Sequence, residues 1–173
     1  MNIKVERAFG CQVSDGKLFC ACSEGVMRIF QADSLQHIVT MARPPPLGDT
    51  NILVGVSKIK IPTSNESKFA DVICCIVDQV NNRVVTLYSD RMLFIWDIKK
   101  FDHMNVYRTF HSHRGPIHDI QQIPNALSVG TNGKPESLQF TQNEEDLTKF
   151  VTCSSDRTVR FWNFIDPSVT LDR

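Results

Sequence analysis

A block of fourteen residues occurs three times in this chain, at equal spacing and without a gap. The copies begin at Leu18, Val84 and Phe150, so each lies 66 residues after the previous one. Each copy contains an acidic residue preceded by a serine, and each ends near an aromatic residue. The acidic residues are Glu24, Asp90 and Asp156, and the aromatic residues are Phe30, Trp96 and Trp162. A block that recurs at fixed alignment indicates a fold built from copies of one structural unit.

Each copy of the block predicts two short antiparallel strands joined by a tight turn. In the third copy an apolar run at 150–153 leads into the turn Ser154-Ser155-Asp156-Arg157, and the following residues alternate between apolar and polar up to Trp162. This pattern is typical of a β-hairpin. The alternative interpretation is a β-sandwich in which the three hairpins are unrelated.

The repeated unit resembles the WD repeat. Trp96-Asp97 is the dipeptide that names that family, Trp162-Asn163 is a common variant, and Phe30-Gln31 is a degenerate one. The resemblance implies an all-β chain, a WD-repeat β-propeller segment in which each unit is one four-stranded antiparallel blade. A blade takes about 40–45 residues and known propellers have about 4–8 blades. We therefore expect about three blades, an incomplete propeller whose further blades are missing.

The expected blades divide the chain into one partial propeller domain, 1–173, with two insertions. Blade one covers about 7–41, an insertion covers 42–70, blade two covers about 71–111, and blade three covers about 113–171 with an insertion at 125–147. In the second blade we expect strands at 72–77, 83–88, 92–98 and 105–111. Proline-rich and turn-rich composition marks both insertions, because proline cannot donate to a strand ladder.

Composition argues against nucleic acid and membrane partners. The chain has 19 Lys and Arg and 19 Asp and Glu, so its formal net charge is zero, whereas phosphate binding needs a basic surplus. No apolar run approaches the roughly 18 residues of a membrane span, and the first residues lack the apolar core of a secretory signal.

Because no secretory signal is found, we interpret all six cysteines as reduced, buried core thiols of a cytoplasmic protein. They are Cys11, Cys20, Cys22, Cys74, Cys75 and Cys153.

The resemblance also implies a structural tetrad. In WD repeats a histidine before the inner strand, a Ser or Thr in the second strand, the turn Asp and the Trp are hydrogen-bonded to one another. The third blade matches this set with His113, Thr152, Asp156 and Trp162. Buried indole and hydroxyl groups need such partners.

The other two blades match the tetrad less well. The second blade has a partial tetrad of Thr86, Asp90 and Trp96, without a histidine at the matching place. The first blade has only Glu24, so we expect no tetrad there.

Catalytic and metal sites are weaker interpretations of the same residues. A Thr-Asp-His set resembles a catalytic triad, but the hydroxyl lies inside a predicted strand and no G-x-S-x-G nucleophile elbow is present. His111, His113 and His118 form the one candidate metal cluster, and we do not expect a zinc site. We therefore expect no catalytic residue, no metal and no cofactor.

A closer resemblance rests on three segments. They are A-R-P-P-P-L-G at 42–48, V-Y-R-T-F-H-S-H at 106–113, and the third copy of the block. Together they are similar to the mitogen-activated-protein-kinase-binding protein and WD-repeat protein 62 family. That resemblance implies a non-catalytic protein–protein interaction scaffold in the cytoplasm, at the cytoskeleton or at the spindle pole. Kinase-cascade components would bind it through regions outside this chain.

The alternative function is a propeller enzyme, hydrolase-like, with its site at the central channel. Such a site needs polar residues that converge at the ends of the inner strands. The predicted inner strands offer Gln12, Asp119, Gln121 and Gln122, without paired carboxylates. The interaction scaffold is therefore the favoured interpretation.

Overall fold

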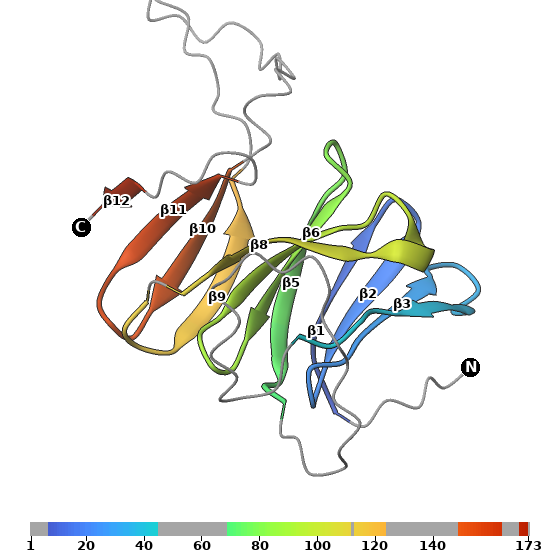
Figure 1. Ribbon diagram of the computed structural model, residues 1–173, viewed down its shortest axis with the longest axis horizontal. Coiled ribbons are helices and arrows are strands. Elements are labelled where there is room, and N and C mark those ends of the chain that lie inside the picture. Colours follow the sequence, from blue (N-terminus) through green and yellow to red (C-terminus); the bar gives the residue numbers. More distant parts are fainter. Residues whose placement is uncertain (1–6, 45–68, 112, 124–148, 164–169, 173) are drawn as a thin grey trace, which may run out of the picture.

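The computed structural model describes residues 7–44, 69–111, 113–123 and 149–163, and the backbone of 170–172. These residues form three antiparallel four-stranded sheets, each with its strands in sequential order. The described part contains no α-helix and one short 3₁₀ turn, η2, at Phe101–His103. The prediction of an all-β chain with about three four-stranded blades is confirmed (Figure 1).

The first sheet contains β1 (Ala8–Ser14), β2 (Lys17–Cys22), β3 (Met27–Gln31) and β4 (His37–Thr40). Asp15 and Gly16 join β1 to β2, and both have a positive φ, 48° and 64°. Two consecutive left-handed residues make the turn whose twist matches that of a hairpin, which is why Asp-Gly is favoured there.

The second sheet contains β5 (Val72–Asp78), β6 (Arg83–Tyr88), β7 (Leu93–Asp97) and β8 (Asn105–Phe110). These bounds lie within one residue of the four strands expected from the sequence. The third sheet contains β9 (Ile117–Gln122), β10 (Lys149–Ser154), β11 (Val159–Asn163) and β12 (Thr170–Asp172). Most of each expected insertion, 42–70 and 125–147, lies outside the described residues, so the division of the chain into domains and insertions stays a prediction.

The middle hairpin of each sheet has the same pairing register. Leu18 pairs with Phe30, Val84 with Trp96, and Phe150 with Trp162. The residue two positions before the second strand is also equivalent in all three, because Gly25, Arg91 and Arg157 have positive φ values of 70°, 75° and 67°. The sequence repeat is therefore a repeat of strand register and of the backbone conformation at this turn position, although Glu24 also has a positive φ, 56°, and the equivalent Asp90 and Asp156 do not.

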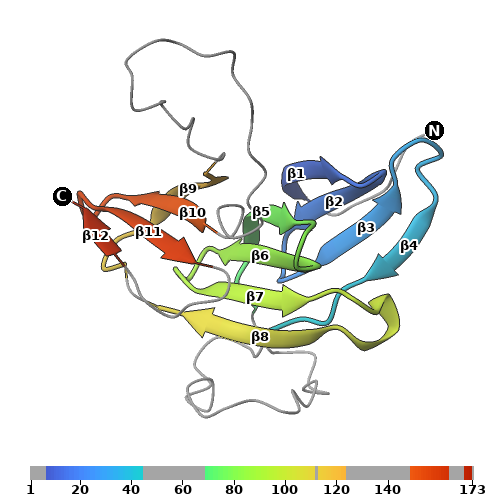
Figure 2. The same ribbon diagram turned by 90° about the horizontal axis from the view of Figure 1, so that it is seen from above.

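The sheets pack face to face like blades, with β1, β5 and β9 on the inner side and β4 and β8 on the outer side (Figure 2). One apolar cluster joins the first sheet to the face of the second that carries Trp96. Another cluster joins the opposite face of the second sheet to the face of the third that carries Trp162. Each junction thus pairs an apolar face that has no tryptophan with a face that carries one.

The apolar face of the third sheet that points away from the second sheet is more exposed than the equivalent faces of the first and second sheets. Phe19, Ala21, Met27 and Ile29 of the first blade and Val85, Leu87, Leu93 and Ile95 of the second are at most 1% exposed. At the equivalent positions of the third blade, Val159 is 42% exposed and Val151, Cys153 and Phe161 are half-buried. An exposed apolar sheet face is expected of an incomplete propeller.

The interpretation of all six cysteines as core thiols is wrong for Cys11. Every described cysteine is free, but Cys11 is exposed, and Cys74 and Cys153 are only half-buried. The reason lies in β1, where Phe9, Cys11 and Val13 share the face that points away from the second sheet. Phe9 is 41% and Val13 63% exposed on that face.

Among the residues that the structure describes, no helix has the length and apolar character needed to cross a membrane.

Candidate functional site

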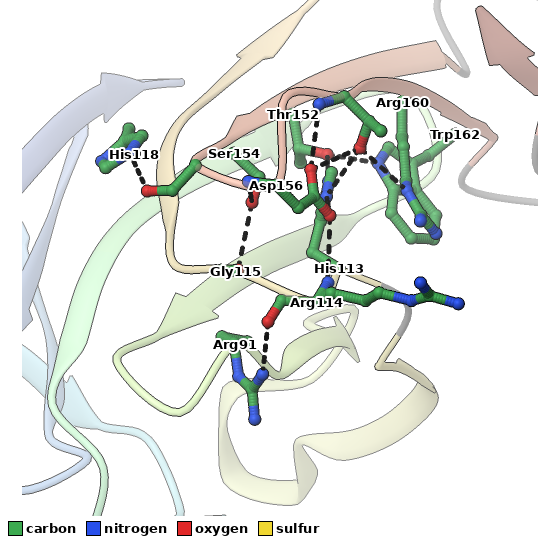
Figure 3. A network of polar contacts seen from close by, with 12 residues as sticks. Arg91, His113, Arg114, Gly115, His118, Thr152, Ser154, Asp156, Arg160 and Trp162 are labelled. Carbon is green, nitrogen blue, oxygen red and sulfur yellow. Dashed lines mark hydrogen bonds and ion pairs between the residues drawn. The ribbon is translucent and has the colours of Figure 1, made fainter. Parts of the chain in front are cut away.

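The four residues of the expected tetrad lie together in the third blade, in one continuous chain of contacts (Figure 3). Trp162 Nε1 donates to Thr152 Oγ1 at 2.8 Å, and Thr152 Oγ1 lies 2.8 Å from His113 Nε2. His113 Nδ1 lies 2.9 Å from Asp156 Oδ2. The strands β10 and β11 hold Thr152 and Trp162, whereas His113 precedes β9 and Asp156 lies in the β10–β11 turn.

The contacts indicate which atom donates and which accepts in each hydrogen bond of the network. A carboxylate can only accept, so His113 Nδ1–H donates to Asp156. In the neutral imidazole the other ring nitrogen, Nε2, is then the acceptor for the Thr152 hydroxyl, whose oxygen in turn accepts from Trp162. This imidazole tautomer, assigned from the network, leaves each of the four side chains with a partner.

Three of the four side chains are almost fully buried, so their polar atoms need hydrogen-bond partners within the protein. Trp162 is 2%, Thr152 1% and His113 2% exposed. The Trp162 ring stacks on Phe150, with centroids 5.9 Å apart, and lies 4.8 Å from Phe110 of the second blade. A polar group buried among such rings costs free energy unless it is hydrogen-bonded.

Asp156 receives more hydrogen bonds than the sequence indicated. Oδ2 also accepts from the amide of Arg114 at 3.0 Å, and Oδ1 accepts from the amide and the hydroxyl of Thr158 at 3.0 Å and 2.6 Å. Burial raises the pKa of Asp156, but the hydrogen bonds from Thr158, His113 and the Arg114 amide outweigh it. The net pKa lies well below the ordinary value of 3.8, so this carboxyl group is ionised.

The second blade keeps half of this arrangement. Trp96 Nε1 donates to Thr86 Oγ1 at 2.8 Å, as in the third blade. The Thr86 hydroxyl, with no histidine beside it, donates to the carbonyl of Phe94 at 3.4 Å. Asp90 accepts from the amide of Met92 at 3.0 Å. The structure thus brings Thr86 and Trp96 together and leaves Asp90 in its own turn.

A tyrosine lies next to Thr86 in the second blade. Tyr88 is 2% exposed, and its ring meets Phe94 edge-on at 5.1 Å. Burial raises the pKa of the Tyr88 hydroxyl, and hydrogen bonding with Thr86 lowers it in part. The sequence alone does not mark Tyr88, since a tyrosine two positions after the threonine is typical of any strand.

The first blade lacks the network. Glu24 is exposed and reaches Arg43 at 3.8 Å, while its amide donates to Asp71 Oδ1 at 2.8 Å. The positions of the threonine and the tryptophan are occupied by Cys20 and Phe30, both buried in a separate apolar cluster.

Gly115 also shapes the site, although we did not predict this from the sequence. A Cβ atom on it would lie 2.8 Å from the amide nitrogen of Asp156, closer than such atoms approach one another. The chain between His113 and β9 therefore runs against the β10–β11 turn, where Ser154 Oγ donates to the Gly115 carbonyl at 3.0 Å. A glycine followed by proline in the sequence was the available signal, because Gly-Pro marks a special backbone position.

The three candidate metal ligands lie in different environments. Both ring nitrogens of His113 are engaged, by Asp156 and Thr152, and His118 Nε2 lies 2.6 Å from Ser155 Oγ. His111 is exposed. Within the described ranges no group of His, Cys, Asp or Glu is arranged to hold a metal ion.

A family model described as "WD domain, G-beta repeat" matches residues 136–163. The match falls on the third blade, which is the blade with the complete network. The first two blades depart from the repeat at the network positions described above.

The chain is also similar to curated proteins over nearly its whole length. It is 29% identical over 173 residues to "WD repeat-containing protein 62" of Mus musculus. The aligned region covers 98% of this chain and 10% of the relative. It is 27% identical over 154 residues to "Mitogen-activated protein kinase-binding protein 1" of Homo sapiens. The aligned region covers 87% of this chain and 9% of the relative. The chain thus spans about a tenth of the length of the curated relatives it matches.

Proposed function

Because this chain consists of WD-repeat blades, we propose that it is a non-catalytic segment of a protein-interaction scaffold. In this proposal the four residues of the third blade are a structural tetrad. They hold the β10–β11 hairpin to the segment before β9, and they take no part in chemistry on a substrate.

One observation carries the proposal. The Thr152 hydroxyl, which would be the nucleophile of a Thr-His-Asp triad, is 1% exposed and accepts a hydrogen bond from Trp162. A nucleophile must reach a substrate carbonyl, so it has to be accessible beside its base. The resemblance to a triad therefore arises from polar groups that satisfy one another inside a blade.

The alternative, a hydrolase-like site at the central channel, has less support. Asp119 is the one acidic residue among the inner-strand positions considered. Its Oδ1 accepts from the Ile120 amide at 2.8 Å and its Oδ2 from Gln121 Nε2 at 2.9 Å. General acid–base hydrolysis of the paired-carboxylate type needs a second carboxyl group nearby. β1 carries no acidic residue, and the one acidic residue of β5, Asp78, accepts hydrogen bonds from its own turn.

The kind of partner is suggested by the relatives. One of them is named for binding a mitogen-activated protein kinase. We propose that the protein serves a kinase cascade, in the cytoplasm and at the cytoskeleton or spindle pole. The kinase contact itself would be made by regions outside these residues.

Site-specific photo-crosslinking in cells tests the proposal. A photoreactive phenylalanine analogue is placed in the intact protein at Ile38 of β4, Val80 of the β5–β6 turn or Tyr107 of β8, which are 38%, 44% and 42% exposed. The proposal predicts that at least one position forms adducts with other proteins, identified by mass spectrometry. The matched control carries the analogue at Phe150, which is fully buried, and should form none. A folded protein without adducts at any exposed position would contradict the proposal.

A further inference from the structure

Two cysteines, Cys11 of β1 and Cys20 of β2, lie directly opposite each other in the first blade. Cys20 has the position that a threonine has in the other blades. The equivalent pairs of the second and third blades are Cys75–Thr86 and Ile120–Thr152. Of the three sheets that the structure describes, the first alone therefore has two thiols at this pair.

The turn between β1 and β2 shows which kind of pair the two cysteines form. Ser14 and Lys17 flank the two-residue turn and pair with each other, so they are the hydrogen-bonded ends of that turn. Hydrogen-bonded and non-hydrogen-bonded pairs alternate along antiparallel strands. The pair Cys11–Cys20 lies three positions further along each strand, and it is therefore a non-hydrogen-bonded pair.

A non-hydrogen-bonded pair has the spacing that a disulfide needs. Its Cα atoms are about 4.5 Å apart, and its side chains approach more closely than those of a hydrogen-bonded pair. A disulfide joins Cα atoms about 4.4–6.8 Å apart. The strands can therefore be bridged here without a change of register.

The other cysteines near this pair are less well placed to bond with Cys11. Cys22 has Ala8 as its register partner, and its Sγ donates to the carbonyl of Cys20 at 3.5 Å. A diagonal position of this kind is about 7–8 Å away, beyond the range of a disulfide. Cys75 belongs to the apolar cluster between the first and second blades, whereas Cys11 points away from the second sheet.

The two thiols of the pair differ in access to solvent. Cys11 is exposed, whereas Cys20 is 8% exposed. Burial raises the pKa of the Cys20 thiol to about 11, and the nearby thiols of Cys22 and Cys11 act in the same direction. Because only a thiolate attacks a disulfide, Cys11 is the residue that reacts first with a dissolved disulfide, and Cys20 reacts second.

We propose that Cys11 and Cys20 form a cross-strand disulfide when the chain meets a small-molecule disulfide such as oxidised glutathione. The Cys11 thiolate attacks one sulfur of the small disulfide, whose S–S bond breaks, and one small thiol leaves. The Cys20 thiolate then attacks the Cys11 sulfur, forms the protein disulfide and displaces the second small thiol. Two protein thiols are oxidised, their two protons pass to the two departing thiolates, and the small disulfide is reduced.

The bond gives the first blade a reversible covalent link in place of the hydrogen-bonded network that it lacks. It closes a short loop around the β1–β2 turn, and a closed loop restricts the unfolded chain. The oxidised chain should therefore unfold at a higher temperature than the reduced chain. This inference goes beyond the proposed scaffold function and does not depend on it.

Treatment of the folded 173-residue chain with excess oxidised glutathione, followed by alkylation and tryptic digestion, tests the pair. Trypsin places Cys11 in peptide 8–17 and Cys20 in peptide 18–28. The expected main product is these two peptides joined by a disulfide. Fragmentation in the mass spectrometer should locate the bond at Cys20 and not at Cys22.

Two variants at accessible positions connect the bond to its effect. Cys11→Ser should abolish both the joined peptides and the rise in unfolding temperature on oxidation. Cys153→Ser is the matched control, because Cys153 is half-buried in the third blade, and it should change neither.

Three results would overturn the inference. They are a lasting glutathione adduct on Cys11 without joined peptides, a main product that joins Cys11 to another cysteine, and equal yields of the joined peptides from the folded chain and from the chain unfolded in urea. An oxidised chain that unfolds at no higher temperature than the reduced chain would overturn the stabilising effect of the bond.

Discussion

His113 Nδ1 lies 2.9 Å from Asp156 Oδ2, although 43 residues separate them in the chain. This contact ties the segment before the innermost strand of the third blade to the turn between its two middle strands. The same turn acid in the second blade, Asp90, accepts only from the amide of Met92 among the described contacts. The turn acid therefore connects distant segments in the third blade, whereas in the second blade it stabilises only its own turn.

Removal of the threonine hydroxyl should destabilise both the third and the second blade. Thr152→Val leaves two buried groups without a partner, Trp162 Nε1–H and His113 Nε2, and Thr86→Val removes the hydrogen-bond partner of Trp96 Nε1–H and of the Tyr88 hydroxyl. An orphaned buried group costs roughly 1–3 kcal/mol, so each variant should lower the free energy of unfolding by at least about 1 kcal/mol. Urea unfolding of the intact protein measures both.

The matched control for the threonine pair is Thr109→Val. Thr109 is half-buried in β8, and its hydroxyl has no hydrogen bond within the described part of the chain. This variant should change the unfolding free energy by less than about 0.5 kcal/mol. Equal losses in all three variants would mean that the network contributes nothing.

Acid should weaken the third blade through Asp156. Its pKa in the folded state lies below the ordinary value of 3.8, so the ionised carboxylate stabilises the fold above that value. The contribution is lost as the pH falls through the folded-state pKa. We expect the difference in unfolding midpoint between the wild type and Asp156→Asn to be constant above about pH 5 and to narrow towards pH 3.

The control for the pH series is Asp102→Asn, an exposed acid in η2 whose carboxylate has no hydrogen bond with the described residues. A constant difference between wild type and Asp156→Asn down to pH 3 would contradict the assignment of the hydrogen bonds to the ionised form.

Gly115 should not tolerate a side chain. In Gly115→Ala the new Cβ atom would meet the Asp156 amide nitrogen at 2.8 Å and the backbone of Ser155 at 3.2 Å. Because backbone cannot move aside as a flexible side chain can, we expect a loss of about 1–3 kcal/mol. Arg114→Ala is the control, since it keeps the amide that donates to Asp156 and should cost less than about 0.5 kcal/mol. Similar midpoints for the two variants would mean that the turn is not in close contact.

The cysteines should differ in reactivity with an alkylating agent. Burial raises the pKa of Cys20 to about 11 and that of Cys74 to about 12, and only the thiolate reacts. Cys11 is exposed on β1. In the folded 173-residue chain at pH 8, iodoacetamide should therefore modify Cys11 first, as followed by mass spectrometry of the peptides. Equal rates at Cys11 and Cys20 would contradict the described burial.

The repeat explains why the fold was predictable. Side chains alternate across a strand, so three aligned hairpins must have the same register, and Leu18, Val84 and Phe150 do pair with the aromatic residues of their blocks. The positions of His113, Thr152, Asp156 and Trp162 followed from the family resemblance. The distances of their hydrogen bonds could be seen only in the structure.

Other features depend on contacts that no local pattern contains. The exposure of Cys11 depends on which face of β1 lacks a neighbouring blade, and alternation alone does not reveal that. The restriction at Gly115 comes from a turn 41 residues later, at Asp156. A cavity between the first two blades brings Phe19, Val77 and Lys99 together, and nothing in their sequence neighbourhoods indicates that they meet.

If Asp156 stabilises the fold through its hydrogen bonds, three alanine variants of the intact protein should unfold at different temperatures. The thermal unfolding midpoint should fall most in Asp156→Ala, which removes the acceptor of His113, Arg114 and Thr158. It should fall less in Asp90→Ala, whose blade lacks the histidine, and least in Glu24→Ala, whose side chain is exposed. Equal midpoints in all three variants, or an unchanged midpoint in Asp156→Ala together with lost partner binding, would mean that Asp156 does not stabilise the fold.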